Sequence, residues 1–179
     1  MEKIKFEKIS EFKDIDITMP VRKTAAAAGY DIYAAADIVI EPYIDILYNL
    51  TKTANPTDIK SLEDMANITK VSNLRPTLIP TGIKCKMESN QYLELVLRSS
   101  CPLKYWLIMG NSVGIIDSDY YNNPDNEGHI YFQVINLSPF PIEIKKGEAI
   151  GQGIIKNYLT TDNDNFLDTK RTGGFGSTG

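Results

Sequence analysis

Short runs of β-branched and aromatic residues, separated by glycine, proline, asparagine and aspartate, recur along most of this chain and limit what it can fold into. The runs include GYDIYAA, DIVIEP, TLIPTGIKCKM, YLELVLRS, GHIYFQVINL and FPIEIKKGEAIGQGIIKNY. Several of them alternate with a period of two, as residues 92–97 do, and this period is typical of half-buried strands. The spacing of the runs resembles that of a β-barrel or sandwich, so the sequence predicts a mostly β fold.

One stretch departs from this pattern. In NPTDIKSLEDMANITKVS, residues 55–72, Asn55 can serve as an N-cap, Pro56 stands at the first helical position, and apolar residues follow at a spacing of three to four. The stretch predicts one short amphipathic helix. Because the strand pattern lapses from about residue 44 to 75, we interpret this segment as an insert in a β framework.

Length and composition indicate a globular chain. At 179 residues it has the size of one ordinary domain, so we expect residues 1–179 to form a single domain. Hydrophobic residues make up 42% and charged residues 23%, which is close to soluble globular averages and excludes wholesale disorder.

Charge and hydropathy exclude two classes of partner. The formal net charge is −4 and no basic stretch is longer than two residues, so we expect no nucleic-acid partner. No apolar run approaches the length of a membrane span, and the start MEKIKFEKIS is charged where a signal peptide needs an apolar stretch. We therefore predict no membrane association and a cytoplasmic protein.

Cysteine and histidine offer little chemistry. Cys85 and Cys101 lack the spacing of a zinc site and the density of a disulfide scaffold, so free thiols are expected. The only histidine, His129, stands beside a predicted strand and is expected to form a structural hydrogen bond. Without a His-based metal site or a Ser-His-Asp triad, catalysis would depend on carboxylates and a bound metal.

The stretch GNSVGIIDSDYYNNPDNEGHIYFQV contains two carboxylates, Asp117 and Asp119, after a turn-forming Gly110-Asn111 pair. A turn, apolar residues and then an acid suggest a β-hairpin with an aspartate at its base. Strand alternation would place both aspartates on one face unless a bend intervenes. Such an aspartate could act as a general base or bind a hard cation, but the stretch is also compatible with a simple polar turn.

Three other motifs carry weaker signals. LRSS ends a strand with Arg98, Ser99 and Ser100, whose donors suit phosphate oxygens, although such a triplet also occurs in many surface loops. AAAAGYDIYAA places Asp31 among small residues that favour tight packing. In KKGEAIGQGII, Gln152 is flanked by two glycines, where a ligand or another backbone could come close.

The chain ends in KRTGGFGSTG, residues 170–179. Its glycines would let successive N–H groups converge on an anion, and its hydroxyls and cations add further donors. A flexible terminal linker fits the same composition. Phe175 favours a ligand-binding arm, because an aromatic ring in a mobile segment can stack on something flat.

In this order, AAGYDIYAA, LRSS, GNSVGIIDSDY, GEAIGQGI and GGFGSTG resemble the five motifs of the all-β, homotrimeric dUTPase family (deoxyuridine triphosphate nucleotidohydrolases). The resemblance runs from about residue 25 to 179 without the segment 44–75. It implies a dUTPase-like β-barrel or jelly-roll (β-clip) fold, a flexible C-terminal arm, and hydrolysis of dUTP to dUMP and pyrophosphate with Mg²⁺ on the triphosphate.

The resemblance also implies roles for the third motif. Asp117 matches the general base that deprotonates water for attack on the α-phosphorus. Tyr120 matches the tyrosine that lies under the deoxyribose and excludes a 2′-hydroxyl. The segment from Asn111 through Gly114 to Ile116 matches the hairpin that reads uracil with backbone groups and an asparagine.

Phosphate and metal ligands follow from the remaining motifs. Arg98 and Ser99, with Ser100 beside them, match the phosphate-gripping residues, and Gln152 matches a glutamine that helps hold phosphate and water. Asp31 matches an aspartate near the metal, which we expect it to contact through water. In the homotrimers of this family, active sites form between subunits.

The arm departs from the family pattern at its entrance. Lys170 stands where an arginine is usual and Arg171 where glycine is usual, so either cation could reach the triphosphate. Phe175 would cap the uracil ring, while Gly176 and Ser177 would bind on the γ-phosphate side. Two further departures are Leu97 in place of a proline and a longer loop, YNNPDNEG, after Tyr120.

Two alternatives remain open from the sequence. The first is a dCTP deaminase or bifunctional enzyme of the same fold. The second is a regulatory binding protein that signals through the 44–75 insert, alone or in addition to dUTP hydrolysis. The insert itself could be a surface decoration, a trimer-edge element or a docking site for a protein partner, since some phage members of this family carry segments that bind regulators.

Overall fold

The computed structural model describes residues 4–53, 75–165 and 171–174, together with positions 61, 63, 64 and 67. The elements in chain order are β1 (Lys5–Lys8), η1 (Ser10–Phe12), β2 (Tyr30–Tyr33), β3 (Ile38–Ile40), α1 (Tyr43–Thr53), β4 (Thr77–Pro80), β5 (Ile83–Lys86), β6 (Gln91–Leu97), α3 (Ser100–Tyr105), β7 (Leu107–Met109), β8 (Gly114–Asp117), η3 (Ser118–Tyr120), β9 (Tyr131–Asn136), β10 (Ile142–Ile144) and β11 (Ala149–Asn157). Strands dominate this list, which confirms the predicted mostly β class.

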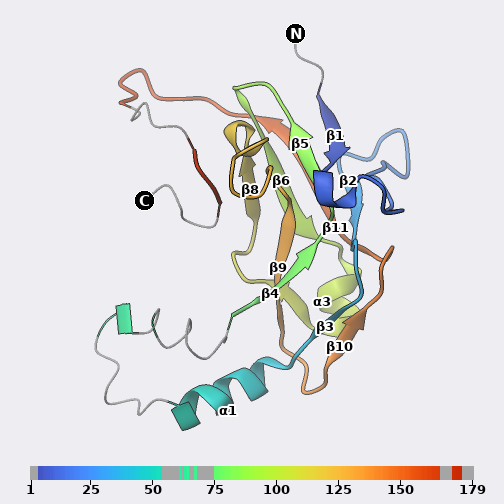
Figure 1. Cartoon of the computed structure of the whole chain (residues 1–179), viewed down its shortest axis with the longest axis vertical. Helices are drawn as coiled ribbons and strands as arrows, with labels where there is room; N and C mark the ends of the chain where they lie inside the picture. The colour runs from blue at the N-terminus through green and yellow to red at the C-terminus, as the bar shows by residue number, and fades with distance from the viewer. Residues whose placement is uncertain are drawn as a thin grey trace.

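The strands form four sheets that stack into one jelly-roll-like body (Figure 1). The largest sheet has the order β2-β11-β6-β8, and a three-stranded sheet has the order β4-β9-β7. Two antiparallel pairs, β1-β5 and β10-β3, complete the body. All strand pairs are antiparallel, and the described strands do not close into a single hydrogen-bonded barrel.

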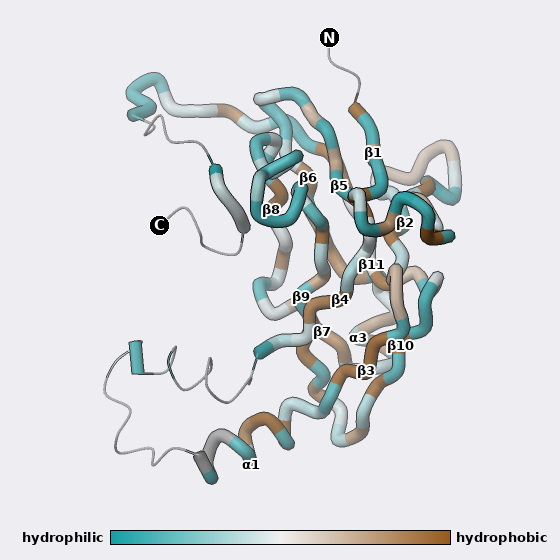
Figure 2. Tube along the Cα trace, in the orientation of Figure 1, coloured by the Kyte–Doolittle hydropathy of each residue, from teal (hydrophilic) through white to brown (hydrophobic). Residues whose placement is uncertain are grey.

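The core lies between the two larger sheets. In β9 every second residue is buried, so Phe132 and Val134 face inward, as the period-two pattern predicts. Leu93 and Leu95 of β6 point into the same core. Figure 2 shows hydrophobic segments following the strands, whereas the loop after β8 is hydrophilic.

Strand β11 passes closely over the buried ring of Phe132. It has a register irregularity between Ala149 and Gly151, where it pairs with β2. A methyl group added to Gly151 would lie 2.2 Å from Cε1 of Phe132. The absence of a side chain at Gly151 therefore allows this close approach.

The helices differ from the prediction. The structure has α1 at the start of the insert, where the sequence showed only a lapse of the strand pattern, and it has α3 directly after Arg98 and Ser99. The helix predicted for 55–72 lies almost entirely outside the described residues, although positions 63, 64 and 67 are helical. α1 projects from one end of the body (Figure 1).

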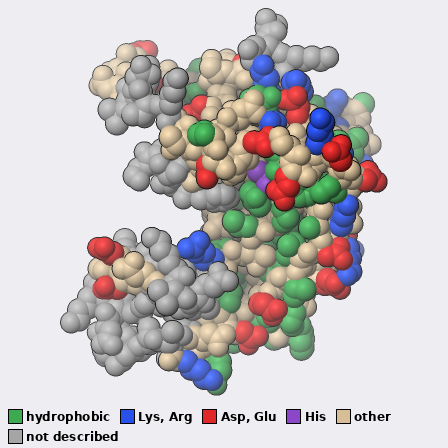
Figure 3. Space-filling view, in the orientation of Figure 1, with side chains coloured by type: hydrophobic (Ala, Val, Ile, Leu, Met, Phe, Trp, Pro, Cys, Tyr) green, Lys and Arg blue, Asp and Glu red, His purple; other side chains and the backbone are tan. Residues whose placement is uncertain are grey.

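Free thiols and mixed surface charge agree with the sequence. Cys85 and Cys101 are both buried and unpaired. On the face shown in Figure 3, acidic and basic side chains are interspersed around the end of the molecule that carries β1. None of the described helices is both long enough and apolar enough to span a membrane.

Candidate active site

A cavity of about 490 Å³ lies beside β8 and is the centre of the candidate site. Its walls come from the β7–β8 connection, from β8 and η3, from the start of β9, and from the described part of the C-terminal arm. Six residues predicted for the site line it: Asn111, Gly114, Ile116, Asp117, Tyr120 and Arg171.

The predicted hairpin around the cavity is wrong in its pairing. β7 pairs with β9, and β8 pairs with β6, so the two strands belong to different sheets. The connection turns tightly, with Val113 N–H donating to the Asn111 carbonyl at 2.6 Å and Ser112 at a positive φ of 61°. Because β8 pairs only with β6 among the described strands, backbone groups of its other edge can face a ligand in the cavity.

The two carboxylates of the third motif meet one guanidinium. β8 ends at Asp117, and η3 bends the chain, so the strand alternation expected for Asp119 does not continue. Nη2 of Arg171 lies 2.5 Å from Oδ2 of Asp117, and its Nε lies 2.9 Å from Oδ1 of Asp119. The second contact is an ion pair without hydrogen-bond geometry, because Nε of Arg171 has no hydrogen-bond partner among the described residues.

Tyr120 forms a rigid part of the cavity wall. It is 5% exposed, its hydroxyl donates to the His129 carbonyl at 3.0 Å, and the same hydroxyl accepts from Nδ2 of Asn126 at 2.7 Å. The Arg171 guanidinium lies 5.8 Å from the ring centroid. Burial raises the pKa of Tyr120, so the hydroxyl stays protonated near neutral pH.

The arm packs on this ring. A methyl group added to Gly174 would lie 2.8 Å from Cε2 of Tyr120, so this position of the arm requires a residue without a side chain. Lys170, Phe175, Gly176 and Ser177 were also predicted to bind the substrate, and they lie outside the described residues.

The other predicted site residues form a second group on the same four-stranded sheet. Asp31 of β2 is opposite Gln152 of β11, and Nε2 of Gln152 donates to Oδ1 of Asp31 at 3.2 Å. Asp31 is only 3% exposed. Arg98 follows β6, where its N–H donates to the Ile150 carbonyl at 3.1 Å, and Ser99 comes next, before α3.

The two groups lie at different ends of β6. Asp117 is opposite Tyr92, and Arg98 comes six positions after Tyr92. At about 3.3 Å per residue, these positions are separated by roughly 20 Å along the sheet. Accordingly, none of Asp31, Arg98, Ser99, Ser100 and Gln152 lines the cavity.

Metal-binding side chains are sparse in the described part of the chain. No three His, Cys, Asp or Glu side chains there come together in a way that could hold a metal ion. Mg²⁺ usually keeps several waters and takes one or two carboxylates together with substrate phosphates. A single carboxylate such as Asp31 fits a magnesium ion that is held chiefly by a phosphate ligand.

Sequence reasoning missed part of the wall contributed by β9 and the residues before it. His129, Tyr131 and Gln133 line the cavity together, and their alternate positions in one strand run could have signalled a shared face. His129 also has the predicted structural role, because its Nε2 accepts from Gly82 N–H at 2.9 Å. Burial lowers the pKa of His129 from 6.5 to about 4.

Comparison with known proteins identifies relatives of this chain. The sequence model of the dUTPase family matches residues 56–179. A deoxyuridine 5′-triphosphate nucleotidohydrolase of Lactococcus lactis is 40% identical over 97% of this chain and 96% of its own length. The crystal structure of a dUTPase from Streptococcus mutans has a TM-score of 0.67 and 34% identity, covering 88% of this chain and 98% of that one.

A more distant protein resembles this chain in its fold alone. A mutant dUTPase from phage phi11 of Staphylococcus aureus, described with a structural Mg(II) ion, is 16% identical, with a TM-score of 0.59. The likeness covers 93% of this chain and 98% of the phage protein.

Proposed function

Since the chain belongs to the dUTPase family and hydrolyses dUTP to dUMP, we propose that Asp117 is the general base of this reaction. The observation that carries the proposal is the position of this carboxylate at the end of β8, in the cavity wall and with half of its side chain exposed. A carboxylate so placed can accept a proton from water, and its exposure gives that water access.

The proposed reaction is a direct displacement at phosphorus. Water attacks the α-phosphorus, the bond from this phosphorus to the oxygen that bridges to the β-phosphorus breaks, and pyrophosphate leaves. The proton lost by the water passes to Asp117. Because Arg171 contacts Asp117 in the structure described, we infer that the guanidinium shifts toward the triphosphate when the substrate binds.

The cavity supplies a place for the nucleoside. We propose that uracil lies against β8 and the connection from Asn111 to Gly114, where backbone groups of a strand edge that pairs with no other described strand can match its donors and acceptors. Tyr120 would lie under the deoxyribose. The buried ring supports this role, because a fixed wall leaves no space for an extra hydroxyl.

We propose that a complete site needs more than one subunit of a homotrimer. Arg98, Ser99, Ser100 and Gln152 would bind phosphate oxygens, yet in one chain Arg98 lies roughly 20 Å, and Gln152 roughly 13 Å, along the sheet from Asp117. A second subunit that presents this group to the cavity would resolve the separation. The arm, with Lys170 or Arg171 at its entrance and with Phe175, Gly176 and Ser177 beyond, would close over the nucleotide.

We propose Mg²⁺ as the cofactor. Asp31 would approach it through water, and the triphosphate oxygens would supply most of its other ligands. Bound in this way, Mg²⁺ neutralises charge on the triphosphate. The hydrogen bond from Gln152 orients the Asp31 carboxylate and supports this assignment.

We also propose that the insert is a docking site for a protein partner, which is one of the three roles that the sequence left open. Exposed apolar side chains on α1 support this proposal, because Ile44 is 61% and Leu47 is 39% exposed. A pull-down comparing the full chain with a chain that lacks residues 44–75 tests it. Retention of the same partners by the shortened chain would argue against this role.

The experiment that tests the proposed base measures pyrophosphate release from each deoxynucleoside triphosphate by the wild-type protein and by Asp117→Asn. The asparagine keeps the shape of the side chain but cannot accept the proton. We expect dUTP to be strongly preferred and the variant to lose on the order of 10²–10⁴-fold in rate. Wild-type turnover by Asp117→Asn would rule out this residue as the base.

A further inference from the structure

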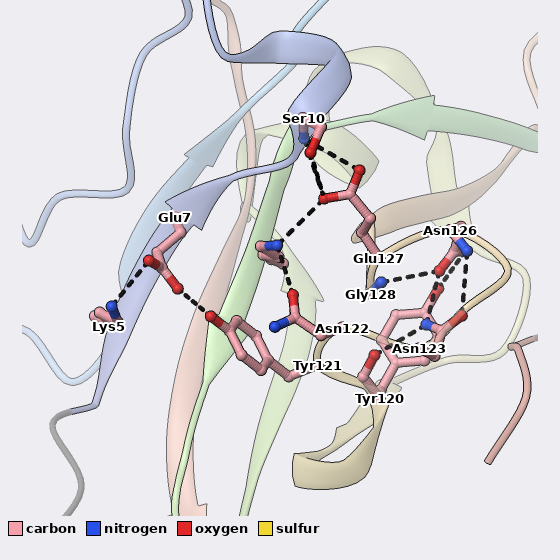
Figure 4. A network of polar contacts seen from close by, with 11 residues as sticks. Lys5, Glu7, Ser10, Tyr120, Tyr121, Asn122, Asn123, Asn126, Glu127 and Gly128 are labelled. Carbon is pink, nitrogen blue, oxygen red and sulfur yellow. Dashed lines mark hydrogen bonds and ion pairs between the residues drawn. The ribbon is translucent and has the colours of Figure 1, made fainter.

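The loop that follows η3, residues 121–128, contacts Tyr120 through asparagine side chains (Figure 4), and none of its residues lines the cavity. Asn126 is its main contact, because Nδ2 of Asn126 donates to the Tyr120 hydroxyl at 2.7 Å. The carbonyl oxygen of the same side chain accepts from Nδ2 of Asn123 at 2.8 Å and from Gly128 N–H at 3.0 Å. These two contacts fix which way the amide of Asn126 points.

Asn123 organises the loop from within. It is 4% exposed, and its Nδ2 donates to the Tyr120 carbonyl at 2.9 Å. Its Oδ1 accepts from the N–H groups of Asp125 and Asn126, at 3.1 and 3.2 Å. The loop therefore has a defined backbone path that presents Asn126 to the tyrosine.

Gly128 brings the loop back against the tyrosine. It has a φ of 82°, and a methyl group added to it would lie 2.6 Å from the Tyr120 carbonyl oxygen. Only glycine fits at such a close approach. Both the start and the end of the loop are therefore in contact with Tyr120.

The outer side of the loop is attached to β1, η1 and β5. Glu127 accepts from the backbone N–H and the hydroxyl of Ser10, at 3.2 and 3.0 Å, and forms an ion pair with Lys84 at 3.2 Å. Lys84 also donates to Oδ1 of Asn122 at 2.6 Å, and the Tyr121 hydroxyl donates to Glu7. Figure 4 shows these contacts extending from the loop to β1 and η1.

The Tyr120 hydroxyl is consequently engaged on two sides. It donates its proton to the His129 carbonyl and accepts a hydrogen bond from Asn126, while burial leaves it almost no contact with solvent. Because the hydroxyl has these two partners, the ring cannot tilt without breaking a hydrogen bond and leaving a buried polar group unpaired. The face of the ring that contacts Gly174 and Arg171 is thereby held in place.

We propose that Asn126 is a positioning residue that fixes the Tyr120 ring and thereby sets the preference of this enzyme for a 2′-deoxyribose over a ribose. The inference rests on the proposed role of Tyr120 under the sugar. The Tyr120 ring can exclude the 2′-hydroxyl of a ribose only if the ring does not move aside by about the radius of an oxygen atom. Asn126 supplies that rigidity from a position that does not line the cavity.

The test compares Asn126→Asp with the matched control Asp125→Asn. The aspartate in the first variant can still accept from Asn123 and Gly128 but cannot donate to the Tyr120 hydroxyl. The control changes charge by one unit at the neighbouring exposed position, whose contact with the loop passes through its backbone N–H. For each protein the measured quantity is the ratio of kcat/KM for dUTP to that for UTP.

We expect this ratio to fall by about tenfold in Asn126→Asp, as befits one lost hydrogen bond to a buried group, and to stay unchanged in Asp125→Asn. A loss of folded protein alone lowers both kcat/KM values together, so it leaves the ratio unchanged. An unchanged ratio in Asn126→Asp would overturn the inference.

A second variant keeps the proposal testable if Asn126→Asp does not fold. Tyr120→Phe removes the hydroxyl that Asn126 holds and leaves the loop sequence intact, so the ratio should fall in the same way. A wild-type ratio in Tyr120→Phe would also overturn the inference. If instead the wild-type protein itself fails to prefer dUTP over UTP, the proposed role of Tyr120 is wrong and not only the role of Asn126.

Discussion

At the scale of single residues, Asp117 and Asp119 share the Arg171 guanidinium but should differ in their importance for catalysis. Asp119 is 61% exposed, and an exposed ion pair contributes at most about 1 kcal/mol, which corresponds to about fivefold in affinity. We expect Asp119→Asn to lose less than about tenfold in kcat/KM, chiefly because the arm is held less firmly. Pyrophosphate release measured beside Asp117→Asn checks this difference. If Asp119→Asn loses more than Asp117→Asn, Asp119 and not Asp117 is the base.

His129 makes a second prediction at this scale, which concerns pH. Its pKa is about 4 in the folded protein and 6.5 in an unfolded chain, so between these values the unfolded state binds the additional proton. The contribution of neutral His129 to the free energy of unfolding is therefore fully present above pH 6.5 and is lost as the pH falls toward 4. Protonation would also place a hydrogen on Nε2, which now accepts from Gly82.

Urea unfolding at pH 7 and pH 5 measures this effect. We expect a loss of about 2 kcal/mol in the free energy of unfolding of the wild-type protein between the two pH values. The lowered pKa values of Glu7 and Glu127 act only at lower pH, because their unfolded value is 4.5. His129→Gln, which keeps an acceptor for Gly82 but does not titrate, should show a flatter dependence. Equal slopes for both proteins would mean that His129 is not the cause.

At the scale of elements, β11 depends on Gly151, and this makes a prediction about packing. A methyl group at Gly151 would lie 2.2 Å from the Phe132 ring and 2.7 Å from the Val96 carbonyl oxygen. Backbone and a buried ring cannot both give way, so Gly151→Ala should destabilise the protein by about 3 kcal/mol or more. Denaturation at equal protein concentration measures the loss.

Gly110→Ala is the control for this substitution. Its added methyl group would meet Gln133 at 3.4 Å, which is an ordinary contact, and the φ of Gly110 is not positive. We expect a change within about 0.5 kcal/mol. If both variants lose the same stability, crowding at Phe132 does not explain the role of Gly151.

Strands could be predicted from the sequence because their signal is local. The runs that contain β2, β6, β9 and β11 alternate or are rich in β-branched residues, and each one became a strand. β1 was missed because KFEK is short and largely charged, and its pairing with β5 is a contact between distant parts of the chain. α1 was missed although Asp45, Asn49 and Lys52 recur at a spacing of three to four and form one polar face, because no N-cap residue precedes Tyr43 to mark where the helix begins.

Part of the candidate site could also be predicted from the sequence, because its motifs are local. Motif order predicted Asp117, Tyr120 and the connection from Asn111 to Gly114 as parts of one site, and residues of all three line one cavity. The pairing of β7 and β8 with different sheets could not be predicted, because a turn signal does not specify which strands lie on either side. The loop that presents Asn126 to Tyr120 was read only as additional length, since its contacts depend on asparagine side chains folding back on the chain.

At the scale of the whole molecule, the separation of the Asp117 group and the Arg98 group along β6 predicts that each active site is shared by two chains. Two variants test this: Asp117→Asn keeps Arg98 and lacks the base, whereas Arg98→Ala keeps the base and lacks the phosphate ligand. Each variant alone should be nearly inactive, because each assembly lacks either the base or the phosphate ligand in all of its sites. A mixed assembly can combine Asp117 of one subunit with Arg98 of another.

For the proposed homotrimer, we therefore expect activity to return when the two variants are denatured together and refolded into mixed assemblies. With equal amounts, about one quarter of the sites should be intact, because half of the subunits carry each functional group and the two are drawn independently. Pyrophosphate release from dUTP measures the recovery, and the two variants refolded separately and then combined provide the control. No recovery in trimers shown by mass to be mixed would mean that Asp117 and Arg98 act within the same chain.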